Sequence, residues 1–187
     1  MKHSHLFPIL ALTLITTLAC TVFTGGPDYP EQTIPVSTEA VDSLKQQIEQ
    51  AVVNGAQSGV VYLFINETQL TSYLAFKLQQ SADPMFTDPQ VILRDNQMRI
   101  YGKTKQGMFT SNIGIILEVR TDEQGKPKLQ VISADFGPLP LPDGLNEAIT
   151  AIINEAYTGS LGPVATGFRI QTIVIADGVM AIEGRIR

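Results

Sequence analysis

The feature that most constrains the fold is an alternation of apolar and polar residues between Pro89 and Phe136. Successive side chains of a β-strand point to opposite faces, so a period of two predicts strands that have one covered face. Short polar segments interrupt the alternation at Asp95-Asn96, at Gln106-Gly107 and from Thr121 to Pro127. Strands joined by turns of this length pair with their neighbours in sequence. We therefore predict a four-stranded antiparallel meander.

A first helix is predicted before the meander. Apolar residues between Val41 and Val52 recur at the three- and four-residue spacing of one helix face. Ser37 or Thr38 can cap its beginning, and we expect Asn54-Gly55 to end it.

A strand and a second helix follow. The run from Gly59 to Ile65 is rich in β-branched and aromatic residues, which predicts a buried strand. Asn66 stands three residues before Gln69, the spacing of a capping box, and so predicts the beginning of a helix. One side of that helix carries Leu70, Tyr73, Leu74 and Leu78.

The region after the meander predicts a third helix and a final hairpin. Pro138, Pro140 and Pro142 exclude both a helix and a central strand between them. A helix is then expected from Asp143 to Gly159, and two strands are expected on either side of Ala176-Asp177-Gly178. The predicted fold class is α+β, with one antiparallel sheet and about three helices on a single face.

The N-terminal residues have the pattern of a secretory signal. A weakly basic start is followed by an apolar stretch from Leu6 to Ala19 and then by Cys20, the single cysteine of the chain. This stretch is short for a transmembrane helix of roughly 20 residues. The sequence Thr17-Leu18-Ala19-Cys20 resembles the lipobox of bacterial lipoproteins, in which the cysteine becomes the acylated N-terminus. Thr17 departs from that pattern, which usually has Leu, Val or Ile there. The alternatives are secretion with a free thiol and an uncleaved signal anchor.

Three regions follow from this interpretation. Residues 1–19 are the signal peptide, residues 20–37 are the lipidated cysteine with a Pro/Gly-rich tether, and residues 38–187 are a single domain. We expect the protein to lie outside the cytoplasm, anchored to the cell membrane by acyl chains on Cys20.

Composition excludes several classes of function. The chain has a net charge of −5 and no basic run, which argues against nucleic-acid binding. Both histidines, His3 and His5, lie in the signal. The remainder therefore has no Ser-His or Cys-His nucleophile pair and no zinc site built from His and Cys. We predict no catalytic residues, no cofactor and no metal.

Other polar motifs have simpler explanations. Asn66-Glu67-Thr68 fits a glycosylation sequon, but Asn66 is explained as a helix cap. The spacing of Asp83, Asp88 and Asp95 does not fit a calcium loop. The spacing of Glu118, Asp135 and Glu147 does not support a paired-carboxylate site.

The order of elements resembles a known group of envelope proteins. The segments are "FINETQLTSYL", "DPQVILRDNQMRIYGK", "MFTSNIGIILEVR", "KLQVISADFGPLPLP" and "DGLNEAITAIINEAY". They resemble the YpmS-like proteins and, more loosely, the LmeA-like and tubular lipid-binding (TULIP) proteins. The resemblance implies a strongly curved sheet wrapped along a helix, a TULIP-like half-module with a lipid-sized groove. It carries over no catalytic residue.

The same resemblance implies a hydrophobic ligand groove. Its lining would come from two helices and the sheet, namely Leu70, Tyr73, Leu74, Ile100, Ile113, Ile115, Leu117, Leu129, Val131, Ile149 and Ile153. The first hypothesis is a non-enzymatic, membrane-anchored lipoprotein that binds a lipid or another hydrophobic ligand. The alternative is a lipoprotein with a filled core that scaffolds an envelope complex, in which case the apolar residues only pack together.

Overall fold

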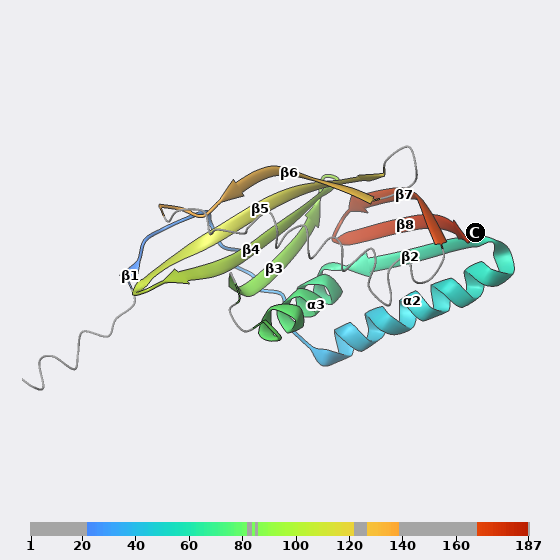
Figure 1. Cartoon of the computed structure of the whole chain (residues 1–187), viewed down its shortest axis with the longest axis horizontal. Helices are drawn as coiled ribbons and strands as arrows, with labels where there is room; N and C mark the ends of the chain where they lie inside the picture. The colour runs from blue at the N-terminus through green and yellow to red at the C-terminus, as the bar shows by residue number, and fades with distance from the viewer. Residues whose placement is uncertain (1–21, 82–83, 85, 122–126, 139–167, 187) are drawn as a thin grey trace, which may run out of the picture.

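The computed structural model describes residues 22–81, 84, 86–121, 127–138 and 168–186, which form an α+β fold with a strongly curled sheet (Figure 1). The described elements are β1 (Val22–Phe23), α2 (Thr38–Ser58), β2 (Val60–Asn66), α3 (Glu67–Gln79), β3 (Thr87–Arg94), β4 (Gln97–Gln106), β5 (Phe109–Thr121), β6 (Pro127–Asp135), β7 (Phe168–Ala176) and β8 (Val179–Ile186). Within these residues, no helix is long and apolar enough to cross a membrane.

The predicted meander is confirmed. Strands β3, β4, β5 and β6 pair antiparallel in sequence order. Asp95 and Asn96 have φ values of 53° and 60° at the turn between β3 and β4, which is the left-handed pair that a tight hairpin requires. The short strand β1 pairs in parallel with the beginning of β5, so the five-stranded sheet is mixed.

The final hairpin is also confirmed, but its sheet differs from the prediction. Strand β8 pairs with β2 on one side and β7 on the other, and these strands form a second, three-stranded sheet. The prediction of a single antiparallel sheet was wrong. The run after Gly59 predicts a strand but does not say which strand it pairs with, and β2 pairs with β8, distant in sequence. The two sheets join at their turns, where Asn96 N donates to Ile175 O and Gly178 N donates to Leu93 O, both at 3.0 Å.

Helix α2 lies along the three-stranded sheet and is longer than predicted. Ser37 caps its beginning by accepting a hydrogen bond from Ala40 N at 3.1 Å. Its end is at Gly59, which has the left-handed φ of 76°. The predicted end at Gly55 was wrong, because that glycine serves close packing instead. A Cβ on Gly55 would overlap the side chain of Val61 in β2.

Helix α3 begins with the predicted capping box and covers the free edge of β3. Asn66 and Gln69 exchange side-chain to backbone hydrogen bonds at 2.9 and 3.0 Å. Two side chains one helical turn apart then accept from the edge of β3. Glu67 Oε1 accepts from Leu93 N at 2.8 Å, and Thr71 Oγ1 accepts from Val91 N at 3.0 Å. An exposed strand edge can pair with other chains, and α3 blocks that pairing here. The predicted third helix lies outside the described residues.

Candidate functional site

Residues 22–37, which we call the strap, lie along the five-stranded sheet. Its first two residues pair with Phe109 and Thr110 of β5. Asn112 then bonds to it twice, since its backbone N donates to Gly25 O at 3.0 Å and its Nδ2 donates to Pro27 O at 3.1 Å.

The strap next crosses from β5 to α3. Tyr29 Oη donates to Asp88 O at 2.7 Å, and the side chain of Gln90 bonds to both the N–H and the carbonyl of Ile34. Ser37 N donates to Ser72 Oγ at 3.1 Å, just before α2 begins. We expected residues 20–37 to be a tether that holds the domain away from a membrane. From residue 22 onward they are extended as expected but are bonded to the domain, because backbone groups flanking the prolines find partners on β5 and β3.

The beginning of the strap packs closely against the end of β6. Both segments occupy the same edge of β5, and Ser111 Oγ lies 2.7 Å from Gly25 O and 3.0 Å from Phe136 O. Gly137 has a φ of 63°, and a Cβ there would lie 2.8 Å from the Cα of Gly26. Glycine is therefore required where the two segments meet.

An open cleft of about 510 Å³ separates the strap from the body of the domain. One wall is the strap from Tyr29 to Val36, and the opposite wall is the C-terminal part of α3 with Ala75 and Leu78. Pro84, Phe86 and the beginning of β3 up to Gln90 also line the cleft. Most of the lining surface is apolar, and this is the volume range in which proteins bind small ligands.

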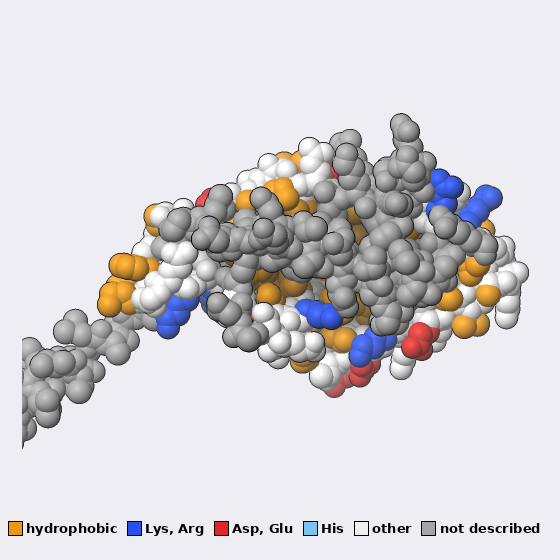
Figure 2. All heavy atoms as spheres, in the orientation of Figure 1, with side chains coloured by type: hydrophobic (Ala, Val, Ile, Leu, Met, Phe, Trp, Pro, Cys, Tyr) orange, Lys and Arg blue, Asp and Glu red, His pale blue; other side chains and the backbone are white. Residues whose placement is uncertain are grey.

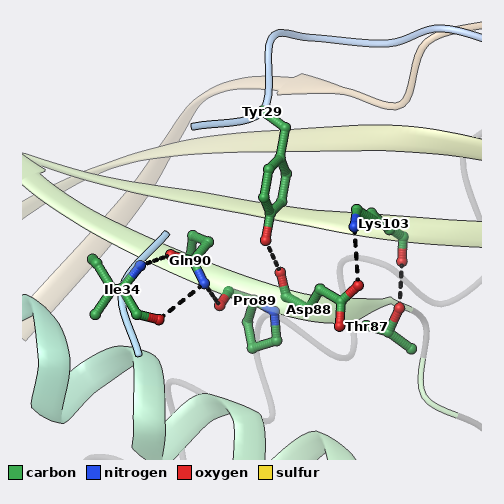
Figure 3. A network of polar contacts seen from close by, with 7 residues as sticks. All are labelled: Tyr29, Ile34, Thr87, Asp88, Pro89, Gln90 and Lys103. Carbon is green, nitrogen blue, oxygen red and sulfur yellow. Dashed lines mark hydrogen bonds and ion pairs between the residues drawn. The ribbon is translucent and has the colours of Figure 1, made fainter. Parts of the chain in front are cut away.

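A polar network lies at one side of the cleft (Figure 3). Lys103 Nζ lies 3.2 Å from Asp88 Oδ2 and 5.1 Å from the ring centroid of Tyr29. Asp88 has a φ of 50° at a bulge in β3, and this irregular backbone places its carbonyl beside Tyr29. The lining of the cleft thus combines apolar side chains with a cation, a carboxylate and a phenol.

Two groups in this network, Tyr29 and Gln90, are partly or fully buried. Burial raises the pKa of Tyr29 above its ordinary value of 10.0, and the negative charge of Asp88 raises it further. Gln90 is buried, and its amide satisfies strap and β3 backbone groups rather than pointing freely into the cleft. Tyr29 is therefore a neutral hydrogen-bond donor at physiological pH.

This arrangement can bind a ligand that has an apolar part and a polar part. Apolar walls can take up a hydrocarbon group, and the polar network can fix the position of a head group. Asp88 pairs with Lys103, and Asp95 pairs with Arg99 at 3.1 Å, so these two carboxylates are not gathered into a calcium loop. Among the described residues, no three His, Cys, Asp or Glu residues form a group that could hold a metal ion.

The structure places most of the predicted groove residues in one packed cluster. Leu74, Ile100, Ile113, Ile115 and Leu117 are buried in it, and Leu70 and Tyr73 pack against it while partly exposed. Val131 is exposed on β6, and Leu129 pairs with Val119 along the backbone. Ile149 and Ile153 lie outside the described residues. The described members of the predicted groove thus belong mainly to the hydrophobic core, and none of them lines the strap cleft.

Sequence reasoning missed the strap cleft because its walls come from segments with no common pattern. Tyr29 and Ile34 lie in a stretch that composition marks only as a spacer, and the sequence suggests Asp88 only as a member of a calcium loop that its spacing does not support. The signal in the sequence is the presence of two large apolar or aromatic side chains, Tyr29 and Ile34, in a Pro-rich spacer, because such side chains favour packing against the domain.

Comparison with protein families, with curated proteins and with solved structures found no match to this chain. The assignment of a function therefore rests on the geometry of the site.

Proposed function

We propose that this chain is a non-enzymatic, membrane-anchored lipoprotein of the bacterial cell envelope that binds a lipid or another hydrophobic ligand. The observation that carries the proposal is the strap cleft, an open, mostly apolar cleft of about 510 Å³ whose lining includes the ion pair of Asp88 and Lys103. The anchor is the proposed acylated Cys20. The curled sheet supports the further proposal that the fold is a TULIP-like half-module.

The lining suggests what part of a ligand goes where. Ile34, Val36 and Leu78 offer aliphatic surface that fits a flexible hydrocarbon chain. The head group would lie near Lys103, whose ammonium has three donors and uses one of them on Asp88. Because Asp88 neutralises Lys103, we expect a polar or zwitterionic head group rather than one chosen by net charge alone.

Native mass spectrometry of the full chain, released from detergent in the instrument, tests this proposal. A non-covalent adduct should accompany the wild-type protein, and solvent extraction of the same preparation should identify it. Covalent acyl chains add to the mass of the denatured chain, whereas a bound ligand adds mass only under native conditions. The two measurements therefore distinguish the anchor from the ligand. Absence of any adduct, together with no extractable lipid, would falsify ligand binding.

A matched pair of variants locates the site. Val36 lines the cleft and is 43% exposed, so Val36→Trp adds bulk in the cleft without disturbing the core. Val53→Trp makes the same change on an exposed face of α2 outside the cleft lining. We expect Val36→Trp to lower adduct occupancy at least tenfold and Val53→Trp to leave it unchanged. Equal occupancy in both variants would place the ligand elsewhere.

A second candidate function, scaffolding of an envelope complex, is favoured by a separate surface. Tyr62, Phe64 and Val174 are exposed on the outer face of the three-stranded sheet. Phe64 and Val174 both pair with Ala181, one from each side, so they lie in one row across the sheet. Large exposed apolar patches mark interaction sites. If this candidate is right, crosslinking should capture one stable partner. Phe64→Ser should abolish that capture, and Val36→Trp should leave it unchanged.

A further inference from the structure

Four apolar side chains are exposed together at the end of the five-stranded sheet. The exposed fractions are 48% for Val22, 61% for Phe23, 58% for Met108 and 44% for Phe109. Val22 N donates to Met108 O at 2.7 Å, and Val22 and Phe109 are register partners. Figure 2 shows hydrophobic side chains gathered at the end of the molecule where β1 lies. We call these four residues the apolar tip.

The tip lies directly beside the proposed anchor. Cys20 precedes Val22 by two residues. A chain spans at most about 3.6 Å per residue, so the Cα of Cys20 lies within about 7 Å of the Cα of Val22. An uncleaved signal anchor would give the same result, because its apolar stretch ends at Ala19. Any attachment of the N-terminus to a bilayer therefore brings the tip to the membrane surface.

The charges near the tip fit a membrane. Residues 22–27 and 104–113 include one charged side chain, Lys105, and no carboxylate, in a chain whose net charge is −5. Lys105 is exposed and lies opposite Thr110 in the register of β4 and β5. A lysine can place its stem on apolar surface while its ammonium remains among lipid head groups. Carboxylates, which anionic lipids would repel, begin along the strap at Asp28, five residues after Phe23.

We infer that the apolar tip inserts into the membrane interface and makes a second contact with the bilayer beside the anchor. The inference rests on the proposed function for the anchor, not for the ligand. It fixes the orientation of the domain, because the long strands β4 and β5 end at the tip and so extend away from the bilayer. The strap begins at the tip and leads to the cleft, which places the cleft on a direct route from the membrane.

The test uses single tryptophans, because the chain contains none of its own. Phe23→Trp and Phe109→Trp place a reporter in the tip. Tyr62→Trp is the matched control, since Tyr62 is an aromatic residue of similar exposure, 58%, on the three-stranded sheet. Each full chain is reconstituted into phosphatidylcholine vesicles with brominated acyl chains, and tryptophan quenching is measured against vesicles of unbrominated lipid.

We expect at least twofold quenching and a blue shift for both tip reporters, and no quenching for Tyr62→Trp. Unquenched tip reporters on a chain whose intact mass shows acylation would overturn the inference, and so would equal quenching of all three. Two tip positions are used so that one misfolded variant does not decide the outcome.

The remaining outcomes are also informative. If the intact mass shows neither acyl chains nor signal, the anchor proposal fails. Quenching of the tip reporters by added vesicles would then still support membrane insertion of the tip, and absence of quenching would overturn it. Crosslinked dimers through the tip without quenching would identify a second copy as its partner and also overturn the inference. Ligand adducts are measured separately, so loss of one proposal does not mimic loss of the other.

Discussion

Removal of the Thr71 hydroxyl should destabilise the protein through a single hydrogen bond between α3 and β3. Thr71 is fully buried, and its Oγ1 accepts from Val91 N at 3.0 Å. Thr71→Val keeps the side-chain shape and nearly the same helix propensity, so no large cavity forms. It leaves the Val91 N–H buried without an acceptor. An unsatisfied buried group of this kind costs about 1–3 kcal/mol in the free energy of unfolding.

That loss is large against a typical total stability of about 5–15 kcal/mol. Urea unfolding followed by far-UV circular dichroism measures it, since the chain has no tryptophan for fluorescence. With a slope of about 2 kcal/mol per M, the midpoint should fall by about 0.5–1.5 M while the slope is unchanged.

Thr68→Val is the matched control, on the same helix one turn earlier. Its side chain is only partly buried. We expect that change to shift the free energy of unfolding by no more than about 0.5 kcal/mol, the usual range for a surface substitution. A Thr71→Val protein as stable as the Thr68→Val control would refute the role assigned to this bond in covering the edge of β3.

Two further outcomes follow from the strap and from α2. Tyr29→Phe should flatten the loss of stability at alkaline pH. Because the pKa of Tyr29 is raised in the folded state, its contribution is complete below about pH 10 and is lost as pH rises through the folded pKa, so wild type and variant should converge in alkaline urea titrations. Steeper alkaline loss in the variant would contradict this sign. Gly55→Ala should lower the free energy of unfolding by about 1–3 kcal/mol, because the new methyl group overlaps the stiff side chain of Val61 and this outweighs the gain of roughly 1 kcal/mol in helix propensity. Asn54→Ala, on the exposed side, should change the free energy of unfolding, measured by urea titration, by no more than a gain of about 0.7 kcal/mol from helix propensity. A stabilised Gly55→Ala protein would show that the helix can move away from β2.

Local signals in the sequence predicted the elements well. Alternation predicted β3 to β6, the Asn66 and Gln69 spacing predicted the capping box, and Asp177-Gly178 predicted the last hairpin. Each of these depends on interactions between residues close in sequence, where period and turn chemistry decide the outcome.

Contacts between distant segments were not predictable in the same way. The partner of β2 depends on which free edge the last hairpin reaches, and nothing in the run after Gly59 specifies β8. Gly55 has the sequence appearance of a helix end, yet a close approach to Val61 explains it. The strap cleft has the same origin, since Tyr29 and Asp88 meet only after the chain has crossed the sheet.

The pairing of β2 with β8 has a consequence for the order in which the chain can assemble. During synthesis or secretion from the N-terminus, β2 emerges early, but its partner follows only after all strands of the meander. Val61, Leu63 and Ile65 therefore have no sheet to complete until late, and among the described elements α2 and α3 are their early neighbours. The strap has the same delay, because Thr24 bonds to Thr110, 86 residues later. Such long-range closures slow folding. The protein thus remains open at both sheets for most of its production, which is the period when a chaperone would have most to protect.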